Sequence, residues 1–284
     1  MTAIYMRRKL SMHDGRNRLS AILDTVSRRE VFIVCHGLAG RADDQEEKIT
    51  SEELERMGYS TFRVSHRTGK RNELLFEEQV RQINESVSLL RNRYDFRAVH
   101  LLGISMGASN AVIAGSMDSR VASICAVSGI SDGETWMRER HGRRYNRFMA
   151  MLNGMEEEEY RTGTPHDISV NDLLEPNRKF RQLIEDAARH DCTRPSALSA
   201  RSVRSLMLHS AVKHVGSIAG RPLVIAHGES DSLVSAENSR RLHAAASEPK
   251  KLMLYGGIDH DLMLHEAARK SVLSAHIDFL SEHS

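Results

Sequence analysis

Three residues far apart in the sequence have the types that acyl-transfer chemistry requires: Ser105, Asp231 and His260. A serine hydroxyl is a weak nucleophile, so it needs a base within hydrogen-bond reach. A histidine base in turn needs a carboxylate that holds its tautomer and stabilises the imidazolium. The sequence therefore predicts Ser105 as nucleophile, His260 as base and Asp231 as the supporting acid.

The candidate nucleophile lies in a short motif, Gly-Ile-Ser-Met-Gly at residues 103–107. An apolar, strand-like run at 98–102 precedes it, and a helix-like run rich in small residues follows at 106–117. A Gly-x-Ser-x-Gly turn between a strand and a helix is typical of a nucleophile elbow. Because this pattern also occurs by chance in loops, its assignment depends on the rest of the chain.

Position selects the base, because the chain contains 15 histidines. His260 follows the last strand-like run in a glycine-containing loop, whereas His243 and His265 lie in helical patterns and are expected to be solvated. Asp231 lies in the loop after the preceding strand. The order serine, aspartate, histidine is the one expected for this topology.

A tetrahedral intermediate needs two preorganised N–H donors for its oxyanion. The amide of Met106, directly after the serine, is one candidate. The amide of Leu38, in the loop at 36–40 after the first core strand, is the other. His36 and Gly37 are predicted to bind substrate, with the alternative that His36 only holds this loop in place.

The elements that position these residues alternate between strand and helix. Strand-like runs are expected at 31–35, 59–64, 98–102, 121–127, 222–226 and 251–255, and helices at 45–58, 74–93, 106–117, 236–246 and 262–281. This alternation predicts an α/β fold, a mostly parallel central sheet with helices on both faces. Segments 3–10 and 18–26 are expected as antiparallel edge strands. The chain 1–284 is predicted to be a single domain.

The alternation fails between residues 130 and 216, where no strand-like apolar run occurs. Apolar residues recur there at helical spacing: Tyr145, Phe148, Met149, Leu152 and then Phe180, Leu183, Ile184. We expect residues 130–216 to form an inserted helical cap. Trp136 and Met137 are predicted to bind substrate, with core packing as the alternative.

The predicted cap also carries five arginines: Arg138, Arg140, Arg143, Arg144 and Arg147. They could bind an anionic substrate group such as a carboxylate or phosphate. The alternative is a solvated helix face balanced by the glutamates at 156–159.

Composition narrows the class of protein. Hydrophobic content of 40% and charged content of 27% are ordinary for a globular protein, and a net charge of +2 gives no reason to expect nucleic acid as a partner. No run approaches the ~18 apolar residues of a membrane span, and none resembles a signal peptide. Three cysteines without metal-ligand spacing favour buried thiols and a cytoplasmic location. We expect neither cofactor nor metal, and leave open whether the chain is a homodimer.

These motifs together resemble those of the α/β-hydrolase superfamily, in the branch of carboxylesterases, cinnamoyl-type esterases and serine-aminopeptidase-like hydrolases. The resemblance is carried by the segments 36–40, 103–107, 227–234 and 256–260, and it extends from about residue 30 to the C-terminus outside the cap. Residues 65–71 depart from the turn that many relatives have after the second core strand.

The resemblance implies a serine esterase that forms an acyl-enzyme and acts on a small-molecule acyl ester. An acyl thioesterase or acyltransferase could use the same three residues with a different leaving group or acceptor. A ligand-binding protein without catalysis is a third alternative, since a fold alone does not imply an activity.

Overall fold

A computed structural model describes the chain except for a few segments, and its described residues are 5–15, 17–27, 29–66, 73–173 and 197–283. The chain divides into two compact units. The sheet unit comprises Met1–Arg67, Gln79–Ser131 and Ser210–Ser284, and the helical unit comprises Thr68–Glu78 and Asp132–His209.

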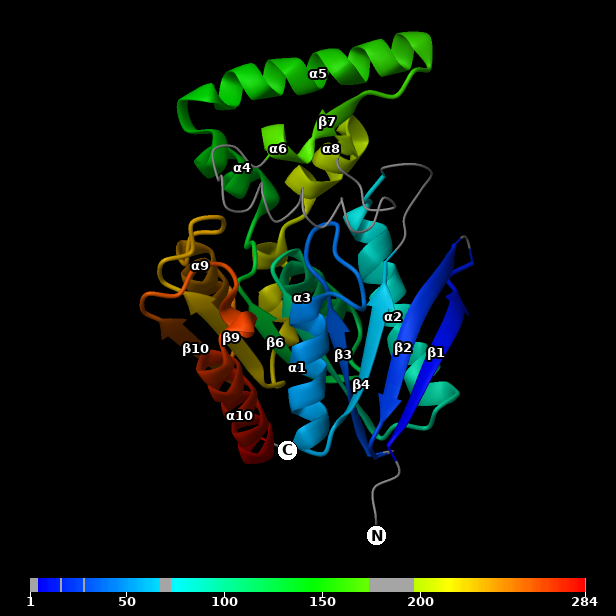
Figure 1. The fold of residues 1–284 in the computed structure, drawn as a ribbon. Coiled ribbons are helices and arrows are strands. Elements are labelled where there is room, and N and C mark those ends of the chain that lie inside the picture. Colours follow the sequence, from blue (N-terminus) through cyan, green and yellow to red (C-terminus); the bar gives the residue numbers. More distant parts are fainter. Residues whose placement is uncertain (1–4, 16, 28, 67–72, 174–196, 284) are drawn as a thin grey trace. The chain divides into compact units, whose positions relative to one another are not determined.

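The sheet unit contains an eight-stranded sheet with the order β1-β2-β4-β3-β5-β6-β9-β10 (Figure 1). Its strands are β1 (Met6–His13), β2 (Arg18–Thr25), β3 (Glu30–Cys35), β4 (Ser60–Ser65), β5 (Ala98–Ile104), β6 (Val121–Val127), β9 (Leu223–Gly228) and β10 (Lys250–Tyr255). All pairs from β4 to β10 are parallel, whereas β2 pairs antiparallel with both β1 and β4. The predicted mostly parallel sheet is confirmed, and so is the antiparallel pair near its edge.

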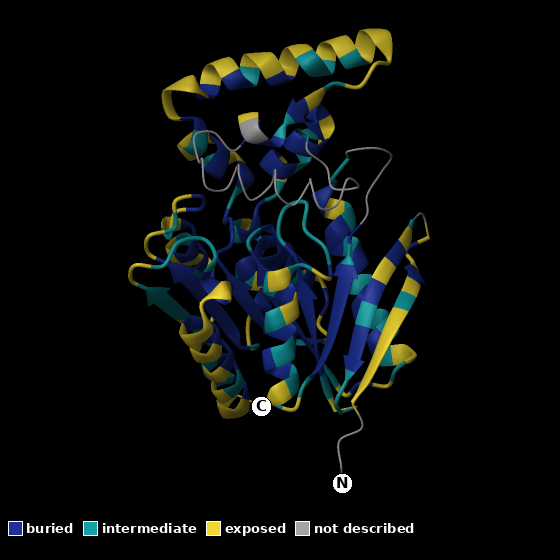
Figure 2. Cartoon of the chain, viewed as in Figure 1, coloured by how far each residue is buried: buried dark blue, intermediate teal, exposed yellow. Residues whose placement is uncertain are grey.

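Helices cover both faces of this sheet. One face packs against α2 (Phe76–Asn92), α3 (Met106–Met117) and α9 (Glu237–Ala245), and the other against α1 (Gln45–Arg56) and α10 (Glu266–Glu282). The inner parallel strands β3, β5, β6 and β9 are buried on both sides and mostly apolar, whereas the edge strand β1 is largely exposed (Figure 2). Because the inner strands are parallel, their carboxyl ends lie at one edge of the sheet, where the candidate residues lie.

The helical unit contains α4 (Gly133–His141), α5 (Tyr145–Thr162), α6 (Val170–Leu173) and α8 (Ala200–Leu208), with a short 3₁₀ turn at Gly142–Arg144. The apolar spacing in α5 is confirmed, because Tyr145, Phe148 and Leu152 are buried. The second apolar group, at 180–184, lies outside the described residues.

This mainly helical unit also contains two short strands, which no apolar run in the sequence had indicated. Two three-residue strands, β7 (Asp167–Ser169) and β8 (Ala197–Ser199), pair antiparallel. Three residues are too few to show a period-2 pattern in the sequence. Strands this short depend on backbone pairing and on the elements beside them. Among the residues that the structure describes, no helix has the length and apolar character needed to cross a bilayer.

Candidate active site

Ser105 stands at the tight junction between β5 and α3. Its backbone has φ +56° and ψ −122°, a conformation that non-glycine residues rarely adopt. The flanking glycines make this turn possible. A Cβ on Gly103 would lie 2.1 Å from the carbonyl oxygen of Gly107, and a Cβ on Gly107 would lie 2.2 Å from that of Cys35. The motif therefore presents the serine at the carboxyl edge of the sheet, as the sequence predicts.

The structure brings the three candidate residues together in one chain of contacts. His260 Nε2 lies 2.9 Å from Ser105 Oγ, and His260 Nδ1 lies 2.7 Å from Asp231 Oδ2. The side chain of Asp231 is fully buried and that of His260 is 14% exposed. The carboxylate can only accept, so His260 carries its hydrogen on Nδ1 and offers a bare Nε2 to the serine hydroxyl. In this tautomer the imidazole is ready to take the serine proton.

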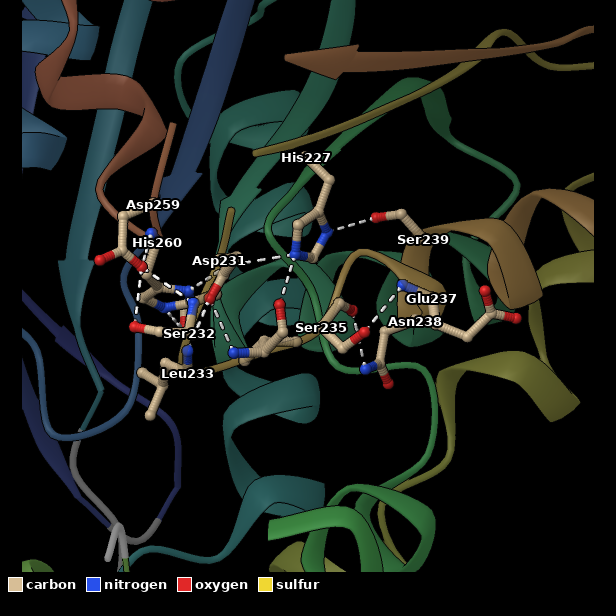
Figure 3. Close-up of polar contacts among 12 residues, drawn as sticks. His227, Asp231, Ser232, Leu233, Ser235, Glu237, Asn238, Ser239, Asp259 and His260 are labelled. Atoms are coloured by element: carbon tan, nitrogen blue, oxygen red, sulfur yellow. Dashed lines mark hydrogen bonds and ion pairs between the residues drawn. The ribbon is translucent and has the colours of Figure 1, made fainter. Parts of the chain in front are cut away.

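Hydrogen bonds link the two loops that carry Asp231 and His260. Asp259 Oδ1 accepts hydrogen bonds from the amide of Ser232 at 2.9 Å, from its hydroxyl at 3.0 Å and from the amide of His260 at 2.8 Å (Figure 3). Gly228 permits the close approach, because a Cβ there would lie 2.3 Å from the carbonyl oxygen of Ile258. Asp259 thus holds the loop of Asp231 against the loop of His260.

Asp231 is held as a carboxylate by several donors. Its Oδ1 accepts from the amides of Leu233 at 2.9 Å and Val234 at 2.8 Å. Burial alone would raise the pKa of Asp231, but hydrogen bonds from His227 and His260 outweigh burial and hold the pKa well below its ordinary value. The acid therefore stays ionised over the whole range in which a histidine titrates.

The two backbone amides that the sequence predicts as oxyanion donors lie on either side of the nucleophile's turn, in α3 and in the loop after β3. Met106 is the first residue of α3, where an amide has no partner within the helix. Residues 37–40 form a turn closed by the amide of Gly40 on the carbonyl of Gly37 at 3.1 Å, a bond that does not use the amide of Leu38. Gly37 lies against the nucleophile, since a Cβ on it would be 3.3 Å from Ser105 Cβ.

His36 fixes the orientation of this turn. Its Nε2 accepts from the amide of His66 at 3.1 Å, so Nδ1 carries the hydrogen that is donated to the Gly37 carbonyl at 2.8 Å. The Gly37 carbonyl and the Leu38 amide belong to one planar trans peptide and point in opposite directions. Holding the carbonyl therefore also aims the amide of Leu38.

The sequence matches a known family over most of its length. Residues 26–267 match the family model Hydrolase_4, described as serine aminopeptidase, S33. The chain belongs to this family. No curated protein matches the sequence. Members of this family are α/β hydrolases, and the fold described above is theirs.

Solved structures show the same fold. The α/β hydrolase GrgF from Penicillium sp. sh18 superposes with a TM-score of 0.79 at 18% identity, covering 98% of this chain and 99% of that chain. For Est1E from Butyrivibrio proteoclasticus the TM-score is 0.67 at 16% identity, covering 96% and 99%. For the monoacylglycerol lipase of Paleococcus ferrophilus it is 0.66 at 17% identity, covering 99% and 100%.

The remaining predicted residues of this α/β hydrolase lie in the helical unit. Trp136 and Met137 are both buried in α4, and their substrate-binding role stays a prediction. In the arginine group, Arg138 donates to Glu134 at 2.7 Å and lies 4.3 Å from the ring centroid of Tyr145. These contacts give this arginine a place on an exposed helix face.

The thiols of the sheet unit are buried and unbridged. Cys35 and Cys125 are free, and burial raises the pKa of each to about 12. They are therefore neutral core residues at any physiological pH. Cys192 lies outside the described residues.

Sequence reasoning missed one residue of this site. His227 lies near the end of β9 and contacts the carboxylate of Asp231, with Nε2 3.1 Å from Oδ2. His227 begins the motif at 227–234, but the motif did not indicate this contact. Only its spacing of four residues from Asp231, across a turn, could have indicated it.

Proposed function

We propose that this α/β hydrolase cleaves carboxylic esters through Ser105, His260 and Asp231. The observation that carries the proposal is the unbroken contact chain from Ser105 Oγ through His260 to Asp231 Oδ2, with distances of 2.9 Å and 2.7 Å. The first distance lies within the range at which a base takes a proton from a nucleophile, and the second is that of a charge-assisted hydrogen bond that orients the base.

The chemistry follows from this geometry. His260 Nε2 removes the proton of Ser105 as Oγ attacks the ester carbonyl, and the carbonyl electrons move to its oxygen. His260 then protonates the leaving alcohol as the C–O bond breaks, which leaves an acyl group on Ser105. His260 then deprotonates a water molecule, which attacks this acyl group. The bond between the acyl carbon and Ser105 Oγ breaks as His260 returns the proton to Oγ, and the acid is released. Asp231 stays ionised throughout and stabilises the imidazolium in both halves.

The amides of Leu38 and Met106 are proposed to hold the oxyanion of each tetrahedral intermediate. One such donor is typically worth a factor of ~10²–10³ in kcat. Gly37 is proposed to line the substrate site next to the nucleophile, and we assign His36 to holding the loop. The proposed role of residues 130–216 is that of a cap that selects the acyl group.

Carboxylic esters are the substrate class that the comparisons favour. Est1E is an esterase by its name and binds ferulic acid in one solved structure, and the Paleococcus ferrophilus relative is a monoacylglycerol lipase. These folds cover nearly the whole chain. They support an acyl ester, with an alcohol as leaving group, as the first substrate class to test.

The test is turnover of p-nitrophenyl esters of increasing acyl length beside the matching acyl thioesters. We expect hydrolysis of the esters, and a loss on the order of a millionfold in kcat in Ser105→Ala. Ser116→Ala, which removes a serine hydroxyl from the far end of the same helix, is the matched control and should keep full activity. Turnover of thioesters alone, or wild-type rates in Ser105→Ala, would contradict the proposal.

A further inference from the structure

We propose that His227 is a positioning residue for this site, resting on the proposed function above. His227 donates a hydrogen bond to the carboxylate of Asp231, so the negative charge of Asp231 is shared between His227 and His260. Ser239 fixes the ring of His227 in the orientation that this bond needs. His227 does not touch the nucleophile, so it would act only through Asp231.

The contacts of His227 involve both ring nitrogens. Its side chain is fully buried at the end of β9. Nδ1 lies 2.6 Å from the hydroxyl oxygen of Ser239 on α9. Nε2 lies 3.1 Å from Asp231 Oδ2 and 2.8 Å from the carbonyl oxygen of Val234 (Figure 3). The ring therefore links α9 to the loop that carries Asp231.

The chemistry of these partners fixes where the hydrogen lies. A carboxylate and a backbone carbonyl can only accept, so Nε2 of His227 must carry a hydrogen and donate it to both. In the neutral ring Nδ1 is then bare, and Ser239 is the group that donates to it at 2.6 Å. Ser239, itself fully buried, thus stabilises the Nε2–H tautomer.

The result is a carboxylate with every acceptor position in use. Oδ2 accepts hydrogen bonds from the imidazoles of His227 and His260, and Oδ1 accepts hydrogen bonds from the amides of Leu233 and Val234. Such a group cannot rotate without breaking a charge-assisted hydrogen bond. Because Oδ2 divides its negative charge between two donors, it stabilises the imidazolium of His260 less than an unshared oxygen would.

Removal of the hydrogen on Nε2 of His227 has two consequences. The carboxylate loses a constraint, which lowers the rate, and Oδ2 interacts with His260 alone, which moves the acid limb of the pH–rate profile to higher pH. The other titratable groups around these residues are Glu46 on α1, whose pKa burial and nearby carboxylates raise to about 8, and Asp259 and Asp261 beside His260. All three are unchanged by substitution of His227.

Two substitutions separate this role from packing. In His227→Gln the side-chain amide can reach the position of Nε2, whereas in His227→Asn it reaches only that of Nδ1. The readout is the phosphonylation rate with a fluorophosphonate from pH 5 to 8, together with ester turnover. We expect His227→Asn to react about tenfold or more slowly with its acid limb at higher pH, and His227→Gln to keep most of the rate. His243→Asn, on α9, is the matched control and should behave as wild type.

Equal rates and pH profiles in wild type, His227→Asn and His227→Gln would overturn the inference, and so would equal losses in both variants with an unmoved acid limb. Should His227→Asn not fold, two further measurements decide. Ser239→Ala is expected to slow the reaction and move the acid limb in the same direction. Nitrogen-15 spectra of wild type are expected to show a hydrogen on His227 Nε2, and a bare Nε2 would overturn the inference. These spectra require no turnover, so an inactive wild type would contradict the proposed function separately.

Discussion

Single side chains decide the direction of the donors in this site. His36 can donate from Nδ1 only because the amide of His66 occupies Nε2, and this donation holds the carbonyl of Gly37. The rigid peptide between Gly37 and Leu38 transmits that orientation to the amide proposed for the oxyanion. The buried side chain of His36 thus sets the orientation of the backbone amide of Leu38.

Substitution of His36 tests this dependence. In His36→Leu the carbonyl of Gly37 loses a donor, so we expect kcat to fall at least about tenfold, within the limit of ~10²–10³ for complete loss of an oxyanion donor. In His36→Asn a side-chain amide can still donate from the position of Nδ1, so the loss should be smaller. Steady-state kinetics with a p-nitrophenyl ester measure both. Equal losses in the two variants would show that the hydrogen bond is not the cause.

The residues at the centre of the site could be found from the sequence because their types are informative and each follows a strand. Ser105, Asp231 and His260 were identified in this way, and the structure places them in hydrogen-bond contact. His227 could not be assigned, because a histidine inside an apolar strand is indistinguishable by pattern from a core residue. Its role depends on Ser239, twelve residues away, which only the fold brings near.

At the scale of elements, the site depends on how closely backbones approach one another. β3, β5 and α3 meet at Gly107, where a Cβ would lie 2.2 Å from the carbonyl oxygen of Cys35 and 2.6 Å from that of His36. No side-chain movement can relieve such a clash, because both partners are backbone. The elbow therefore requires glycine at this position for steric reasons.

Two glycine-to-alanine substitutions test this requirement. Gly107→Ala should lower the free energy of unfolding by about 3 kcal/mol or more and abolish activity. Gly154→Ala, in the exposed part of α5 where a Cβ meets nothing within 4 Å, is the matched control. It should raise stability by up to about 1 kcal/mol, because alanine is the better helix former. Denaturant unfolding measures both, and an undamaged Gly107→Ala would contradict the packing argument.

Element prediction succeeded where patterns are long. The runs at 31–35 and 222–226 are five residues long and apolar, and the alternation of such runs with helices predicted a mostly parallel sheet. The pair β7 and β8 was missed because three residues cannot establish a period. Their pairing comes from segments about thirty residues apart in the sequence, and local pattern does not reveal it.

At the scale of the whole molecule, buried histidines make stability depend on pH. His100 Nδ1 and His276 Nε2 both lie 2.8 Å from the hydroxyl oxygen of Ser123, in the core beside Phe32. Burial lowers the pKa of His100 to about 4, and burial together with His100 lowers the pKa of His276 to about 3. Both rings are therefore neutral in the folded protein at pH 7.

The sign of the effect follows from linkage. Below pH ~6.5 the unfolded chain binds protons on these rings that the folded protein does not bind, so stability falls with pH until about pH 4. Each ring contributes about 1.4 kcal/mol per pH unit in this window. Denaturant unfolding from pH 7.5 to 4.5 should show a smaller slope in His276→Gln than in wild type. His283→Gln, at the exposed C-terminal end, should leave the slope unchanged, and an unchanged slope in His276→Gln would contradict the argument.

In the proposed mechanism, His260, oriented by Asp231, activates Ser105. Labelling with a fluorophosphonate followed by peptide mass mapping, in wild type and in His260→Ala, tests this activation most directly. We expect one stable adduct on Ser105 in wild type and a greatly slowed or absent adduct in His260→Ala. An adduct on another residue, no adduct on folded wild-type protein, or equal labelling of Ser105 in both proteins would contradict it.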